Sequence, residues 1–149
     1  MSWPPLVRVL LVDDFDAFRS FIRTTLQGLQ GTQLQIIAEV SDGLEAVQKA
    51  EELQPDLILL DIGLPTLNGI EAARRIRKLA PRSKILFLSQ ESSADVIEEA
   101  LKYGVGYVIK THAGSDLLAT IEAMRTAGHF LSTARQPTLV PPTLQNAHP

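Results

Sequence analysis

The sequence predicts an α/β fold, an open and doubly wound sheet of five parallel strands with helices on both faces. Two observations predict it. Strand-like and helix-like segments alternate five times along the chain, which is typical of consecutive βα units. The later strand-like segments are short and continuously apolar, as expected for parallel strands that helices cover on both sides. We expect right-handed connections between the strands, while the pattern leaves the strand order open.

Short apolar runs rich in Val, Ile and Leu mark the five strands. Pro4 and Pro5 stand just before the first run, and a helix-like segment follows each run. The predicted strands are Leu6 to Val12, Leu34 to Val40, Leu57 to Leu60, Ile85 to Leu88 and Val105 to Ile109.

Between these runs, apolar side chains recur every three or four residues, which is typical of amphipathic helices. Gly or Pro follows the first three helices, and we expect Ser115 to cap the fifth helix and Gly128 to end it. The predicted helices are Phe15 to Leu29 with stops at Gly28 and Gly31, Leu44 to Leu53 before Pro55, Ile70 to Leu79 before Pro81, Ala94 to Tyr103, and Ser115 to Thr126.

The composition is that of a soluble globular protein. The chain has 149 residues, 45% of them hydrophobic and 21% charged, which suits one domain with a sizeable core. A net charge of −3 argues against a nucleic-acid surface, and the absence of cysteine excludes disulfides and thiolate metal sites. No signal peptide and no apolar run of about 20 residues is present, so we expect a cytoplasmic location without membrane contact.

The character of the chain changes after Gly128. Residues 129–149 contain four prolines and no sustained period, which indicates an extended tail or the start of a linker. We therefore expect a folded domain over residues 1–128 and a Pro-rich tail over residues 129–149. The tail shows no helix-turn-helix pattern, so we expect no output domain and no specific DNA binding by this chain.

Polar residues end four of the five predicted strands. Asp13 and Asp14 follow the first strand, Asp61 the third, Ser89 the fourth and Lys110 the fifth. The carboxyl ends of parallel strands meet at one edge of the sheet, where ligands bind. Clustered carboxylates repel one another and become tolerable with a cation, and oxygen ligands without His or Cys favour Mg²⁺. A carboxylate can also attack phosphorus and form an aspartyl-phosphate.

Each residue alone has a simpler interpretation. Asp13 and Asp14 would suit a helix N-cap, and Asp61 would suit a turn with Pro65. The remaining candidates would be ordinary loop, surface and packing residues, namely Ser89, Lys110 and Tyr107. Their joint placement at one edge of a sheet favours a site.

These motifs resemble those of the response-regulator receiver domains of bacterial two-component systems. The resemblance rests on residues 9–14, residues 56–65 with Asn68-Gly69, residues 85–89 and residues 104–110. It is closest to receivers of regulators with a C-terminal helix-turn-helix output domain. It implies the flavodoxin-like (βα)₅ receiver fold with strand order 2-1-3-4-5.

The resemblance also implies the roles of the acidic residues. Asp61 would be the phosphoacceptor and a Mg²⁺ ligand. Asp14 would bind Mg²⁺ directly, Asp13 would bind it through water, and Gly63 would supply a backbone carbonyl.

Three further residues would convert phosphorylation into a conformational change. Ser89 would be the switch hydroxyl, Lys110 would pair with a phosphoryl oxygen, and Tyr107 would be the switch aromatic that swings inward.

The function implied is a phosphorylation-dependent signalling switch. A histidine kinase would phosphorylate Asp61, and the face formed by the fourth helix, fifth strand and fifth helix would change. A downstream protein or an output domain would recognise that face, and phosphorylation would favour a homodimer. The chain would not be an enzyme, apart from self-catalysed phosphotransfer and dephosphorylation.

Two alternatives stay open at this point. Asp14 and Asp16 after an apolar strand also resemble the opening motif of haloacid-dehalogenase-type phosphatases, in which Asp14 would be the nucleophile. A pseudo-receiver would bind partners without phosphorylation. The placement of Asp61 argues against the first, and the complete set of five polar residues argues against the second.

Overall fold

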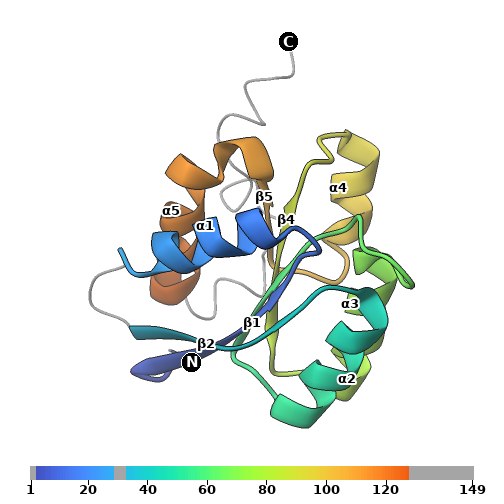
Figure 1. The fold of residues 1–149 in the computed structure, drawn as a ribbon, viewed down its shortest axis with the longest axis horizontal. Coiled ribbons are helices and arrows are strands. Elements are labelled where there is room, and N and C mark those ends of the chain that lie inside the picture. Colours follow the sequence, from blue (N-terminus) through green and yellow to red (C-terminus); the bar gives the residue numbers. More distant parts are fainter. Residues whose placement is uncertain (1–2, 29–32, 128–149) are drawn as a thin grey trace.

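The protein forms a three-layer α/β sandwich around a five-stranded parallel sheet (Figure 1). The computed structural model describes residues 3–28 and 33–127. The strands lie in the order β2-β1-β3-β4-β5, which confirms the implied order. Their bounds are β1 Leu6–Val12, β2 Gln33–Val40, β3 Leu57–Leu60, β4 Lys84–Ser89 and β5 Gly106–Ile109.

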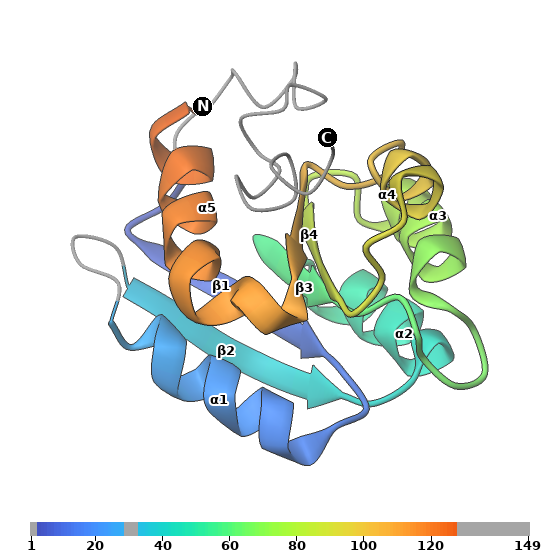
Figure 2. The same ribbon diagram turned by 90° about the horizontal axis from the view of Figure 1, so that it is seen from above.

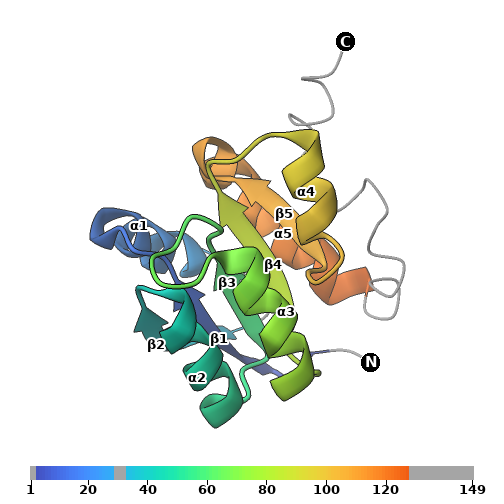
Figure 3. The same cartoon turned by 90° about the vertical axis from the view of Figure 1, so that its right-hand side faces the viewer.

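The helices cover both faces of the sheet. Helices α1 and α5 lie on one side, and α2, α3 and α4 lie on the other (Figure 2). Figure 3 views the sheet from the side that α2, α3 and α4 cover. The bounds are α1 Asp16–Leu26, α2 Gly43–Leu53, α3 Gly69–Leu79, α4 Ala94–Ala100 and α5 Ala113–Ala127, with a 3₁₀ turn, η1, at Lys110–His112.

The strand side chains divide between two hydrophobic cores because successive residues of a strand point to opposite faces. In β1, Leu10 and Val12 belong to the core between the sheet and helices α2, α3 and α4. Val9 and Leu11 pack under α1 and α5. All four side chains are almost completely buried, which explains why the strands show no alternation of polar and apolar residues.

Side-chain caps begin three of the helices. The carboxylate of Asp42 accepts a hydrogen bond from the Glu45 N–H at the start of α2, and Asn68 does the same for α3. Ser93 caps α4. Each cap satisfies an N–H that has no partner within its helix.

Three predicted helix boundaries differ from the structure by two residues or more. Ser115 is not the N-cap of α5, because η1 leads directly into a helix that starts at Ala113. The Ser115 hydroxyl instead donates to the His112 carbonyl. Helix α4 ends at Ala100, three residues before Tyr103, and α1 ends at Leu26. Leu29, Gly31, Gly128 and the predicted tail lie outside the described residues.

Two glycines allow the loop between β3 and α3 to lie against its neighbours. A Cβ on Gly43 would stand 1.8 Å from the Leu67 carbonyl oxygen, and one on Gly69 would stand 1.9 Å from the Asp61 carbonyl oxygen. No side chain fits in such a space. The loop that carries Asp61 into α3 is therefore fixed by backbone contacts.

Candidate phosphoacceptor site

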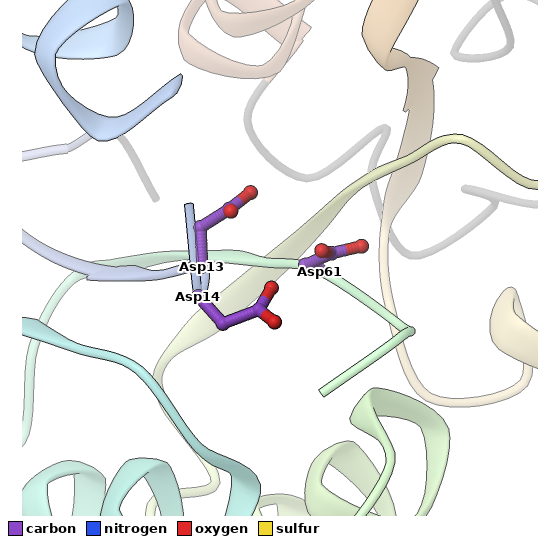
Figure 4. Close-up of side chains that lie close together, drawn as sticks. All are labelled: Asp13, Asp14 and Asp61. Atoms are coloured by element: carbon purple, nitrogen blue, oxygen red, sulfur yellow. The ribbon is translucent and has the colours of Figure 1, made fainter. Parts of the chain in front are cut away.

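Three aspartates meet at the carboxyl edge of the sheet (Figure 4). Asp13 and Asp14 follow β1, and Asp61 follows β3. Oxygen atoms of the three carboxylates lie within 4.8 Å of one another, and we call this group the acidic cluster. Strands β1 and β3 are neighbours, although the chain between them forms β2 and α2. The cluster therefore lies where the order of the strands reverses, the usual ligand site of such sheets.

Asp13 and Asp61 are nearly inaccessible to water, with 1% and 4% of their surfaces exposed, whereas Asp14 is exposed. The Asp61 carboxylate accepts a hydrogen bond of 2.7 Å from the Ile62 N–H and a longer one of 3.4 Å from the Gly63 N–H. Asp13 accepts from the Phe15 N–H at 2.9 Å. Asp13 does not cap α1, because Phe15 stands at the N-cap position and no side chain bonds there.

Lys110 is the counter-ion of the acidic cluster. Its Nζ lies 2.8 Å from Asp13 Oδ2 and 3.0 Å from Asp61 Oδ2, and only 7% of its side chain is exposed. Hydrogen bonds to the two carboxylates raise the pKa of Lys110, while its burial acts in the opposite direction and is the largest single influence. One ammonium thus serves two buried carboxylates and leaves the cluster with an excess of negative charge.

Burial raises the pKa of Asp13, and the nearby Asp61 charge adds to this, against the hydrogen bonds from Lys110 and Phe15. The charged cluster is therefore under electrostatic strain that a further cation would relieve. Three carboxylates without His or Cys provide the hard oxygen ligands that Mg²⁺ prefers. The donor set and the excess negative charge both fit a divalent metal ion.

Ser89 is the last residue of β4, and Tyr107 lies within the neighbouring strand β5. The Ser89 hydroxyl accepts a hydrogen bond from the Glu91 N–H at 3.2 Å. The Tyr107 ring is fully buried and faces Phe87, and its hydroxyl donates to the Glu91 carbonyl at 2.8 Å. Burial raises the pKa of Tyr107 to about 12. The aromatic ring thus already points inward and holds the loop after β4.

The structure adds residues that the sequence reading did not connect with the site. The Arg19 guanidinium donates to the Asp13 carbonyl at 2.5 Å and to Glu39 of β2 at 3.1 Å. The rings of Phe15 and Phe18 lie against Lys110. Three of the five phenylalanines, at positions 15, 18 and 21, fall within one short segment after Asp14, but this clustering does not by itself indicate which residue the rings contact.

The fold and the site both match a known family. The family model for the response regulator receiver domain matches residues 9–122. The chain belongs to this family. Receiver domains are the phosphorylation-dependent signalling switches of bacterial two-component systems, and this chain is one of them. The relatives do not favour the phosphatase or the pseudo-receiver alternative.

The relatives include regulators and an enzyme. The chain is 32% identical over 127 residues to the transcriptional regulatory protein LnrK of Bacillus subtilis, covering 85% of this chain and 57% of that protein. It is 40% identical over 116 residues to a protein-glutamate methylesterase/protein-glutamine glutaminase of Thermotoga maritima, covering 75% and 33%. The matched part of the chain corresponds to between a third and three fifths of the length of these and similar curated relatives.

A solved structure gives the same picture. The two-component response regulator of the LuxR family from Aurantimonas is 30% identical, with a TM-score of 0.74, over 82% of this chain and 86% of that one. The family is a signalling domain family whose members typically bind Mg²⁺ at an acidic pocket. Among the described residues, no helix has the length and apolar character to cross a membrane.

Proposed function

We propose that Asp61 accepts a phosphoryl group from a phosphohistidine of a histidine kinase. The observation that carries the proposal is the position of the Asp61 carboxylate, at the end of β3 and 3.0 Å from Lys110 Nζ within the acidic cluster. A carboxylate oxygen attacks phosphorus, an O–P bond forms, and the P–N bond to the donor breaks with its electron pair left on the imidazole.

Asp13, Asp14 and Asp61 would hold a Mg²⁺ ion, together with the backbone carbonyl of Gly63. The exposed Gly63 follows Asp61 closely, and its N–H approaches the Asp61 carboxylate. When bound, the ion offsets the negative charge on the phosphoryl oxygens. Asp61 supplies the nucleophile, and Lys110 exchanges one carboxylate partner for a phosphoryl oxygen.

Ser89 and Tyr107 form the proposed switch. Ser89 ends β4 and donates its hydroxyl hydrogen to the phosphoryl group, which draws the loop after β4 toward Asp61. Tyr107 is already inward, with its hydroxyl donating to the Glu91 carbonyl, so its proposed part in the switch is to hold the ring and the loop after β4 in place rather than to swing inward. The surface of α4, β5 and α5 then differs between the inactive and the active state. Phosphorylation shifts the equilibrium between these states only because each makes different contacts with the phosphoryl group.

The partners form part of the same proposal. The histidine kinase docks at the acidic edge, and a downstream protein or an output domain recognises the face of α4, β5 and α5. Phosphorylation favours a homodimer through that face. The chain itself binds no DNA, acts in the cytoplasm, and turns over no substrate beyond its own phosphoryl group.

We also propose that residues 1–128 are the receiver domain and that residues 129–149 are a Pro-rich tail or the start of a linker. The last described helix ends at Ala127, and the prolines cluster beyond it.

The test is the formation of a phosphate adduct on the full chain. Acetyl phosphate with Mg²⁺ is expected to add one phosphoryl group to the wild type, measured by intact mass, and none to Asp61→Asn. The variant keeps the size of the side chain and removes the nucleophilic oxygen. An adduct of equal yield on Asp61→Asn would contradict the assignment.

A further inference from the structure

The Lys110 ammonium is enclosed by two carboxylates and by two aromatic rings at the start of α1. Its Nζ lies 4.7 Å from the centre of the Phe18 ring and 5.2 Å from the centre of the Phe15 ring. Both distances fall within the range of about 6 Å in which a cation is attracted to a ring face. Asp13 and Asp61 bind the same nitrogen. We call Phe15 and Phe18 the aromatic pair.

The geometry of α1 explains this contact. Phe15 is the N-cap residue and Phe18 follows three positions later, so the two side chains share one face of the helix. Lys110 reaches the same place from the end of β5. Phe18 is half-buried and packs against the core between α1, α5 and the sheet, whereas 55% of Phe15 is exposed. Phe18 is therefore the firmer of the two contacts.

A lysine side chain has four flexible carbons, and its ammonium is strongly hydrated. Two N–H groups of Lys110 face the carboxylates, and the rings occupy space that water would otherwise fill. Phe15, Phe18 and Lys110 also line an open pocket of about 710 Å³. Without the rings, the ammonium would gain an alternative, hydrated position on the pocket side.

We propose that Phe18, assisted by Phe15, is a positioning residue for phosphoryl transfer to Asp61. It keeps the Lys110 ammonium at the edge between Asp13 and Asp61, where a phosphoryl oxygen arrives. The proposal rests on the proposed function, because it assigns a role in that same reaction. Phe18 touches neither the donor nor the reacting atoms and acts through Lys110.

The test compares Phe18→Leu with Phe18→Tyr in the full chain. Leucine keeps an apolar side chain but has no ring face, while tyrosine keeps the ring at a position that lines the open pocket. With acetyl phosphate and Mg²⁺, Phe18→Leu is expected to phosphorylate about 3- to 10-fold more slowly than the wild type. Phe18→Tyr is expected to stay within about 2-fold of the wild type.

Two further measurements separate positioning from structural damage. The ¹⁵N–¹H signal of the Lys110 ammonium is expected to show an upfield ring-current shift in the wild type and in Phe18→Tyr, and to lose it in Phe18→Leu. Mg²⁺ affinity, measured by calorimetry, is expected to be equal in all three proteins. Lys110→Arg identifies the signal by its disappearance.

Three outcomes would overturn the proposal while Asp61 stays the phosphoacceptor. They are a wild-type rate in Phe18→Leu, an equal slowing in Phe18→Tyr, and a loss of Mg²⁺ affinity in Phe18→Leu as large as the loss of rate. A wild-type chain that gains no phosphate would overturn the proposed function itself, and this proposal with it.

Discussion

Gly69→Ala is expected to destabilise the fold by about 3 kcal/mol or more, measured by urea unfolding. A Cβ at this position would stand 1.9 Å from the Asp61 carbonyl oxygen and 2.8 Å from the Ile62 Cα. Both are backbone atoms, and the Asp61 N–H bonds to the Val12 carbonyl of β1. The clash can be relieved only by moving backbone, either the end of β3 away from β1 or the start of α3 away from Asp61.

The helix propensity of alanine works in the opposite direction but is too small to compensate. Alanine stabilises a helix position by at most about 1 kcal/mol relative to glycine. The matched control is Gly63→Ala in the same loop, where no atom lies within 4 Å of the added Cβ. We expect that change to stay within about 0.5 kcal/mol of the wild type. Equal stability of Gly69→Ala and Gly63→Ala would refute the steric argument.

Lys110→Met is expected to lower the free energy of unfolding by about 3 kcal/mol at neutral pH without divalent cations. Methionine preserves the length and apolar stem of lysine but leaves Asp13 and Asp61 buried without their shared ammonium. Added Mg²⁺ is expected to reduce the loss, because a cation then returns to the acidic cluster. Unfolding curves with Mg²⁺ and with EDTA measure both effects.

The loss is also expected to depend on pH. Burial already raises the pKa of Asp13, and the variant lacks the hydrogen bond from Lys110 that opposes this. The folded variant therefore binds a proton at Asp13 more tightly than the unfolded chain does, so its stability rises as the pH falls through the raised pKa of Asp13. The difference in stability between Lys110→Met and the wild type should therefore narrow as the pH is lowered from neutral toward the usual pKa range of an aspartate.

Lys102→Met is the matched control. Lys102 pairs with Glu99 at the surface, and 61% of its side chain is exposed, so its removal should change stability by less than about 1 kcal/mol. If Lys110→Met lost as little stability as Lys102→Met, the Lys110 ammonium would not be compensating the charge of the buried carboxylates.

The sequence predicted the fold well because the strands are buried on both faces and separated by glycine, proline and cap residues. All five strands were found within one residue at each end. The acidic cluster was also predictable, because parallel strands bring Asp13, Asp14 and Asp61 to one edge wherever they stand in the sequence. Strand order came only from the resemblance to a family.

The spacing of residues along the chain did not predict side-chain contacts between elements that are distant in the sequence. The aromatic residues of α1 fall at helical spacing, and that spacing alone predicts core packing rather than contact with Lys110. Ser115 has the residue type of an N-cap, yet η1 carries the backbone into α5 two residues earlier. Position 69 requires glycine because the backbone of Asp61 passes close to it. The residues around position 69 alone do not predict this contact.

The location of the phosphoryl group distinguishes Asp61 from the other two carboxylates of the acidic cluster as the phosphoacceptor. After reaction of the full chain with acetyl phosphate and Mg²⁺, borohydride reduces an aspartyl-phosphate to homoserine, and peptide mass spectrometry locates the change. We expect homoserine at position 61 and unchanged aspartate at positions 13 and 14. Homoserine at Asp14 with Asp61 intact would contradict it and would favour a phosphatase-type nucleophile.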